Sequence, residues 1–153
     1  MARVCLEAEK EYLASMELRQ MPDTPPDTIE EAIARATMFT AGSLKIRAIA
    51  ALTQSGRTAL MMSRRSSNVA IFALSPQEDT LRKVTLFRGV YPVKFRIETH
   101  DAEVLLNDAE DELLKRGAVR KGDLIALTIG EPVGKAGGTN TIKIVKVGEH
   151  RKG

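Results

Sequence analysis

Short apolar runs that stop abruptly at turn-forming residues recur along this chain, with helical segments between them. The runs are Ala48–Leu52, Val69–Leu74, Val90–Phe95 and Leu124–Ile129. A run of this kind is typical of a strand that is buried on both faces. Because parallel strands need a crossover connection, strands that alternate with helices predict a mostly parallel sheet covered by helices.

Helix signals occupy the intervals between these runs. Thr28 and Glu31 have the spacing of a capping box, and an apolar helical period follows them. Asp101 can cap a longer helix, and Gly117 stands where the C-terminal cap of that helix belongs. The expected helices are 28–41, Arg57–Arg65, Glu78–Phe87 and Asp101–Gly117.

The last expected strand, Thr141–Val147, differs from the others. It alternates enough to be only half-buried, and the loop before it, Gly130–Gly138, has no room for a crossover helix. The strand should therefore be antiparallel and lie at an edge of the sheet. Pro92 favours a strand start or an edge for the third run. We predict a three-layer α/β/α sandwich, with a five-stranded, mostly parallel sheet and an antiparallel edge strand.

A proline-rich connector marks a domain boundary near the N-terminus. Residues 1–18 contain no Gly or Pro, and their composition predicts a helix. Pro22, Pro25 and Pro26 follow this segment closely. Prolines this dense end a helix and stiffen the chain. We expect helix 1–18 to belong to something other than the main domain, which we place at 19–153.

Composition excludes several classes of protein. The net charge of +3 is too small to argue for nucleic acid as a main partner. One cysteine, Cys5, cannot form an internal disulfide and fits a reducing, cytoplasmic compartment. One cysteine and two histidines cannot build a Cys/His zinc site. No apolar run approaches the ~18 residues of a membrane span.

The strongest candidate site follows the first apolar run, where a strand is expected to turn into a helix. Its residues are Thr53, Gln54, Ser55, Gly56, Arg57 and Thr58. The backbone N–H groups and dipole of a helix N-terminus attract anions, and hydroxyls can donate to phosphate oxygens. Ligands bind at this end of the strands in open α/β sheets. The turn therefore predicts phosphate binding, with a helix cap built from Ser and Thr as the alternative.

The loop Gly130–Gly138 is a second candidate, because it contains a Gly-Lys pair. It is not a nucleotide-binding P-loop: the spacing is one residue short, Ala136 replaces the magnesium-binding Ser or Thr, and a strand follows it. Two interpretations stay open, a loop that folds over a ligand and a long hairpin turn. No catalytic constellation is evident, so the residues alone predict a small phosphate-binding or interaction domain.

Taken in order, several stretches resemble the C-terminal domain of bacterial pyruvate kinases. They are Val4–Lys10, Thr53–Ala59, Phe87–Val93, Lys121–Asp123 and Gly138–Thr141. The resemblance implies a part of an enzyme that transfers phosphate from phosphoenolpyruvate to ADP with magnesium and potassium. The catalytic barrel of that enzyme is missing here, and residues 1–18 resemble its last helix. Met1 is then either a cut in a longer protein or a true start.

The resemblance also implies a regulatory and oligomerisation domain without catalysis of its own. The effector phosphate would be held by Thr53, Gln54, Ser55, Gly56, Arg57 and Thr58. The loop that closes over the effector corresponds to Lys135, Ala136, Gly137 and Gly138. The alternative is a stand-alone protein of this kind with its own phosphate-ester ligand or hydrolase activity.

One departure from the family pattern bears on the effector. Relatives that respond to fructose 1,6-bisphosphate use a Trp and an Arg for the second phosphate. This chain has no Trp, and Leu105 stands near the expected Arg. We therefore expect a monophosphate such as AMP, ribose 5-phosphate or glucose 6-phosphate. Lys135 could reach a second phosphate, which leaves a bisphosphate as the alternative.

Self-association is expected through the last strand. An edge strand with unpaired N–H and C=O groups can pair with its copy in another subunit. Lys143 and Lys146 are the only charges of Thr141–Val147, so the strand is apolar enough for this. The alternative is that these lysines protect an exposed edge. The other expected partners are the catalytic domains of the same enzyme.

Overall fold

The computed structural model describes residues 24–65, 68–134 and 138–149. The expected helix 1–18 and residues 19–23 of the expected domain lie outside this part of the chain. The described residues form four helices and five strands. Their bounds are α2 Ile29–Ser43, β1 Ala48–Leu52, α3 Arg57–Ser63, β2 Ala70–Ser75, α4 Glu78–Val84, β3 Val90–Lys94, α5 Ala102–Lys115, β4 Leu124–Gly130 and β5 Thr139–Lys146.

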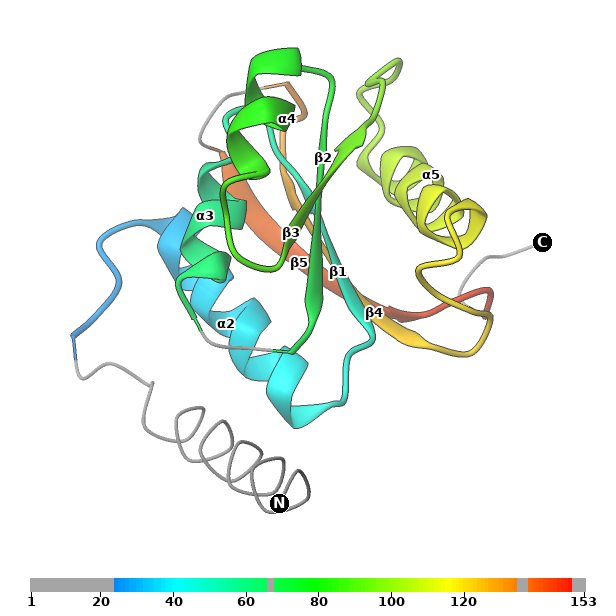
Figure 1. Cartoon of the computed structure of the whole chain (residues 1–153), viewed down its shortest axis with the longest axis horizontal. Helices are drawn as coiled ribbons and strands as arrows, with labels where there is room; N and C mark the ends of the chain where they lie inside the picture. The colour runs from blue at the N-terminus through cyan, green and yellow to red at the C-terminus, as the bar shows by residue number, and fades with distance from the viewer. Residues whose placement is uncertain (1–23, 66–67, 135–137, 150–153) are drawn as a thin grey trace, which may run out of the picture.

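Among the described residues the five strands make one sheet in the order β3-β2-β1-β4-β5 (Figure 1). β1 pairs in parallel with β2 and with β4, and β2 pairs in parallel with β3. β5 runs antiparallel to β4. The predicted fold class is confirmed, and Pro92 lies in the edge strand β3 as its chemistry requires.

Helices cover both faces of the sheet, but unequally. Side chains of α2, α3 and α4 pack on one face, around Ile49 of β1 and Met62 of α3. Of the described helices, α5 packs on the other face, where Leu105 and Leu113 belong to the same core as Leu52 of β1. Because successive residues of a strand point to opposite faces, β1 serves both cores and all five of its residues are buried.

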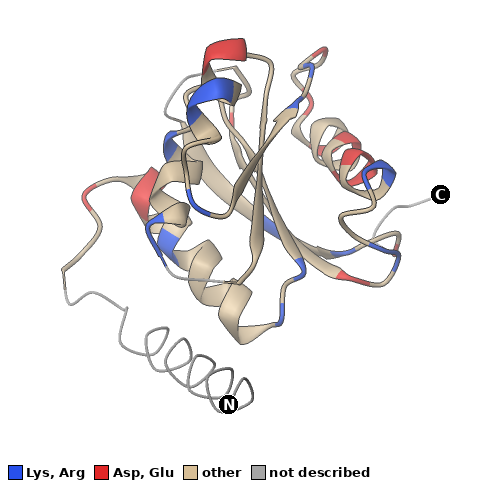
Figure 2. Cartoon of the chain, in the orientation of Figure 1, with Lys and Arg blue, Asp and Glu red and all other residues tan. Residues whose placement is uncertain are grey.

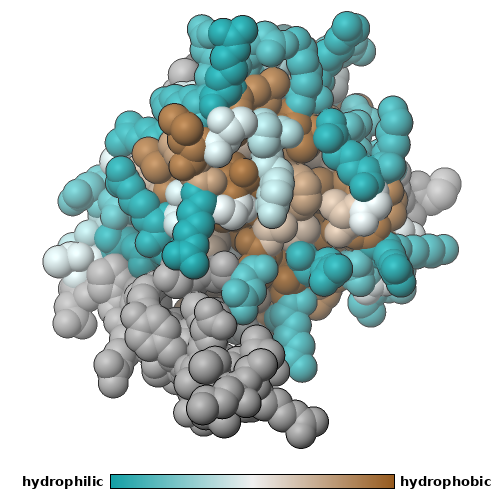
Figure 3. Space-filling model, viewed as in Figure 1, coloured by the Kyte–Doolittle hydropathy of each residue, from teal (hydrophilic) through white to brown (hydrophobic). Residues whose placement is uncertain are grey.

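The β3 edge of the sheet is only partly covered. Phe72 of β2 and Tyr91 of β3 stack with ring centroids 5.5 Å apart, and Tyr91 stays 54% exposed. Figure 3 shows apolar side chains gathered on this side of the molecule, between α4 and α5, within a rim of hydrophilic ones. No helix in the described part of the chain is long and apolar enough to cross a membrane.

Most elements begin or end one to three residues from the predicted bounds, and three of them show a physical reason. α3 stops at Ser63, whose hydroxyl donates to the Leu60 carbonyl, two residues before the expected end. α4 stops at Val84 instead of Phe87, since the N–H groups of Leu86 and Phe87 bond three residues back and tighten the chain. β5 begins at Thr139, before the expected Thr141, because Thr139 pairs with Gly130 across a bulge.

Charges follow the helix dipoles at α4 and α2. Figure 2 shows acidic residues at the start of α4 and basic ones further along it, and these are Glu78 and Asp79, then Arg82 and Lys83. At α2 the predicted cap is confirmed, because the Thr28 hydroxyl accepts from the Glu31 N–H at 3.0 Å. The N–H of Asp27 and the guanidinium of Arg35 both donate to the Glu31 carboxylate and hold its pKa below its ordinary value.

Candidate functional site: the β1–α3 turn

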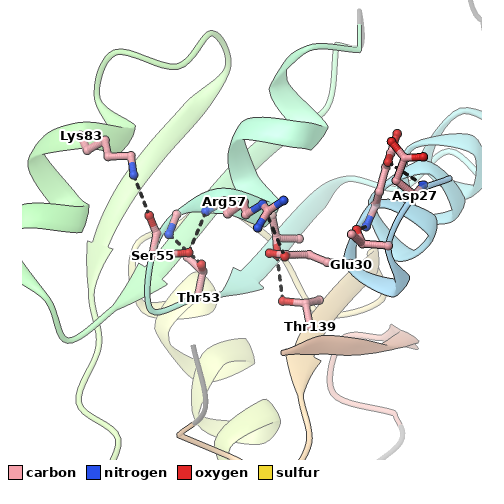
Figure 4. Close-up of polar contacts among 11 residues, drawn as sticks. Asp27, Glu30, Thr53, Ser55, Arg57, Lys83 and Thr139 are labelled. Atoms are coloured by element: carbon pink, nitrogen blue, oxygen red, sulfur yellow. Dashed lines mark hydrogen bonds and ion pairs between the residues drawn. The ribbon is translucent and has the colours of Figure 1, made fainter. Parts of the chain in front are cut away.

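The chain leaves β1 at the carboxyl edge of the sheet and turns directly into α3, and we call residues Thr53–Thr58 the β1–α3 turn. Two hydroxyl oxygens organise it. The Thr53 hydroxyl accepts from the Gly56 N–H at 2.9 Å, and the Ser55 hydroxyl accepts from the Arg57 N–H at 3.3 Å (Figure 4). Since both oxygens act as acceptors here, each hydroxyl can still donate its hydrogen to a ligand.

Gly56 is the N-cap residue of α3, and only glycine suits this position. Its φ is +79°, in the left-handed region that L side chains rarely adopt. A Cβ placed on it would lie 2.9 Å from Cγ1 of Val84 and 3.3 Å from Cγ2 of Thr80. α4 therefore packs directly over the turn, and α3 begins without a side-chain oxygen on its N-cap residue.

Two cations flank the turn. Arg57 leaves 57% of its side chain exposed, and Nζ of Lys83 in α4 donates to the Ser55 carbonyl at 3.2 Å (Figure 4). The Gln54 carbonyl accepts from the Thr80 hydroxyl at 2.6 Å. Lys83 is absent from the sequence prediction, because it lies on another helix and nothing in its local sequence indicates the turn.

A buried carboxylate, Glu30 in the first turn of α2, contacts the other side of the turn. Its Oε1 accepts from the Thr58 hydroxyl at 2.8 Å, and its Oε2 lies 3.8 Å from Nε of Arg57. The hydroxyl oxygens of Thr58 and Thr139 are also 2.8 Å apart. This cluster joins α2, α3 and β5, and the sequence prediction included neither Glu30 nor Thr139.

Two hollows meet at this cluster, and Glu30, Gly138 and Thr139 line both of them. The inner hollow is small, about 30 Å³, and Thr53 and Gln54 line it together with Leu105 and other apolar side chains. None of its described lining residues is Lys or Arg. The outer hollow, about 380 Å³, lies between the start of α2, Arg57 and the loop before β5.

The loop before β5 is closed at its base. The Asn140 side chain accepts from the Glu131 N–H at 3.0 Å and donates to the Glu131 carbonyl at 2.6 Å. Gly138, one of the four residues of the expected closing loop, lines both hollows. The three other residues of that expectation, Lys135, Ala136 and Gly137, lie outside the described residues.

Of the six predicted turn residues, Thr53 and Gln54 line the inner hollow and Arg57 lines the outer one. Thr58 differs from the expectation in one respect: it is fully buried, and its hydroxyl donates to Glu30. Among the described residues, no group of three or more His, Cys, Asp or Glu side chains could hold a metal ion. Chemically, the turn offers hydroxyl donors, helix N–H groups and two cations, which suits an anionic ligand.

The fold first defines a class: an α/β domain with a mostly parallel sheet, a kind of domain in which ligands bind at the carboxyl edge of the strands. The family described as "Pyruvate kinase, alpha/beta domain" matches residues 31–145. The chain belongs to this family. This confirms the resemblance drawn from the sequence.

Individual pyruvate kinases are similar over nearly the whole chain. Pyruvate kinase II of Salmonella typhimurium and a pyruvate kinase of Buchnera aphidicola are each 43% identical over 148 residues, which is 96% of this chain and 30% of each relative. A pyruvate kinase of Staphylococcus aureus is 39% identical over 80% of this chain and 21% of its own length. The chain therefore spans less than a third of the relatives that it matches.

Proposed function

We propose that this chain is the regulatory and oligomerisation domain of a pyruvate kinase and binds a phosphorylated effector at the β1–α3 turn. It has no catalytic role by itself. The whole enzyme would transfer phosphate from phosphoenolpyruvate to ADP in the cytoplasm, with magnesium and potassium held by the catalytic barrel. The observation that carries the effector site is the turn, where two hydroxyls, Arg57 and Lys83 surround the start of α3.

The proposed effector carries one phosphate, as AMP or a sugar monophosphate does. A phosphate at the turn would accept from the hydroxyls of Thr53 and Ser55 and lie between the two cations. The lining of the inner hollow supports the proposal of a single phosphate, because its described residues, Leu105 among them, include no cation that could bind a second one.

Self-association is proposed through β5. In the described sheet β5 has a neighbour strand on one side only, and Ile144 is 38% exposed. Pairing with the β5 of a second copy would satisfy the N–H and C=O groups at this edge. Sedimentation at high micromolar concentration should detect a dimer, and a monomer at that concentration would contradict this part of the proposal.

Thermal melting with a ligand panel tests the effector site. The panel contains AMP, ribose 5-phosphate, glucose 6-phosphate, fructose 1,6-bisphosphate and inorganic phosphate. A ligand at 100 times its Kd should stabilise the protein by ~2.7 kcal/mol, a rise of roughly 5–10 °C in Tm. Arg57→Ala removes a charged contact to phosphate, so about ten times more ligand should be needed to produce the same rise in Tm.

Arg64→Ala is the matched control, since Arg64 is exposed at the opposite end of the same helix. Its melting shift should equal that of the wild type. A panel that produces no shift in the wild type would contradict the effector site. Release of inorganic phosphate from any panel member would instead favour the stand-alone hydrolase.

A further inference from the structure

Glu30 places a negative charge where the proposed site should attract anions. Its side chain is only 5% exposed, and it lines both the inner and the outer hollow. A buried carboxylate is costly unless hydrogen bonds and nearby charge compensate it. The contacts that compensate the charge of Glu30 therefore show which of its oxygen atoms can still accept a hydrogen bond from a ligand.

The hydroxyls beside Glu30 form a directed chain. Thr58 has a single hydroxyl hydrogen, which it donates to Oε1 of Glu30. Thr139, 2.8 Å from the Thr58 oxygen, must then be the donor in that contact. Both hydroxyl hydrogens are thus directed toward the carboxylate, and neither is offered to a ligand anion.

The second carboxylate oxygen, Oε2, remains able to accept from a ligand. Its distance of 3.8 Å to Nε of Arg57 is an ion-pair distance and too long for a hydrogen bond. The other charged residue on the wall of the outer hollow is Glu131. Glu131 is exposed and its charge is screened by solvent, so the buried carboxylate of Glu30 is the charge that favours a hydroxyl donor and disfavours a phosphate.

We propose that Glu30 is the specificity-determining residue of the effector site: it accepts a hydrogen bond from a ligand hydroxyl and excludes a second phosphate from the outer hollow. The proposal rests on the proposed function, because it takes a phosphorylated ligand at the β1–α3 turn as given. Glu30 does not hold the first phosphate. It selects ligands that carry hydroxyl groups beside a single phosphate.

The physical basis is the repulsion between a buried carboxylate and a phosphate dianion. Such repulsion is strong in a site that is shielded from water and weak at an exposed surface. Dinucleotide-binding sites use the same chemistry, since an acidic residue there accepts from a ribose hydroxyl and an arginine takes its place when the hydroxyl carries a phosphate. Glu30 corresponds to the first of these two cases.

Fructose 6-phosphate and fructose 1,6-bisphosphate test the proposal, because they differ by one phosphate. Calorimetric titration of the wild-type chain should give an affinity for the bisphosphate that is lower by about tenfold or more. Glu30→Gln keeps an oxygen that can accept from Thr58 but removes the charge. It should raise the ratio of bisphosphate to monophosphate affinity at least about tenfold.

Two control variants separate charge from structure. Glu131→Gln removes an exposed carboxylate from the same hollow, and it should change the ratio less than about twofold since solvent screens that charge. Glu30→Asp keeps the charge and should keep the preference for the monophosphate. A purely structural role of Glu30 would weaken both ligands equally and leave the ratio unchanged.

The outcomes distinguish this inference from the proposed function. An unchanged ratio in Glu30→Gln would overturn the inference alone. A wild-type chain that binds the bisphosphate as tightly as the monophosphate would also overturn it, without any variant. If the wild type binds neither sugar phosphate nor any member of the earlier panel, the proposed function fails and the inference fails with it.

Discussion

The N-termini of α3 and α5 lie at comparable places in the fold, because each helix follows a parallel strand, yet they are built differently. At α5 the Asp101 carboxylate accepts from the N–H groups of Glu103 and Val104, at 3.0 and 3.4 Å. At α3 the N-cap residue is Gly56, which has no side chain, and the nearby hydroxyls of Thr53 and Ser55 take single N–H groups.

The difference is one of charge. α5 carries its own anion at the positive end of its dipole, so a ligand anion would have to compete with Asp101. The nearest carboxylate to α3, Glu30, bonds the Thr58 hydroxyl instead. No carboxylate therefore caps the N–H groups at the start of α3, and this supports placing an effector phosphate there rather than on α5.

The largest expected effect comes from Gly56→Ala, which distorts the start of α3. The substitution forces an alanine into a φ of +79° and places its Cβ 2.9 Å from Val84. Strain and overpacking together should lower the free energy of unfolding by about 3 kcal/mol. Urea denaturation measures the loss, and ligand melting shifts should vanish with the distorted turn.

Gly89→Ala is the matched control for the backbone strain. Gly89 has a similar φ of +73°, but a Cβ there would meet nothing within 4 Å. Its cost should be about 1 kcal/mol, because only the left-handed conformation is penalised. Equal losses in the two variants would show that the contact between the turn and α4 contributes nothing.

Thr58→Val should have the next largest effect. Valine keeps the shape of the side chain but leaves the buried Glu30 carboxylate without its hydroxyl donor. The expected loss in the free energy of unfolding is about 2 kcal/mol, the usual cost of a buried group that loses its partner. Thr40→Val is the control, since the Thr40 hydroxyl bonds a carbonyl of its own helix, and it should change the stability by less than about 0.5 kcal/mol.

The sequence predicted what depends on local patterns. The Thr28 cap, the Asp101 cap, the buried strand β1 and the antiparallel edge strand each follow from neighbouring residues or from one connection length. The β1–α3 turn was predicted as a site for the same reason, since its hydroxyls and Gly56 are consecutive. Helix ends were less predictable, because α4 ends where its last carbonyls bond three residues ahead.

The missing part of the site depends on contacts between distant segments. Glu30 is 28 residues from Thr58 in the sequence, and Thr139 is 81 residues from it. Lys83 reaches Ser55 across 28 residues from another helix. Nothing in the local sequence of these three residues indicates the turn, so only the packing of α2, α4 and β5 against it reveals them.

Asp101→Ala removes the carboxylate that caps α5, although Glu103 stays in the first turn of this helix. The loss of a cap that serves two N–H groups should cost about 1 kcal/mol in the free energy of unfolding. Asp108→Ala is the control on the exposed face of the same helix, where alanine is the better helix former and should cost nothing. Thermal denaturation of both variants checks the difference, and equal stabilities would show that the cap is not needed.

The smallest expected effect is on the pH dependence of Tm, and it concerns a third helix start, that of α2. The Asp27 N–H and Arg35 hold the pKa of Glu31 below its ordinary value in the folded protein. A lowered pKa means that this stabilisation is fully present above the ordinary pKa of 4.5 and is lost as the pH falls from there through the lower folded pKa. In Glu31→Gln, Tm should therefore fall less steeply over this range than in the wild type. Glu78→Gln removes a second carboxylate of the described residues whose pKa is lowered, in this case by its bond to Lys94. If only Glu78→Gln flattens the profile, the contacts of Glu31 at the start of α2 have no part in the acid sensitivity of the fold.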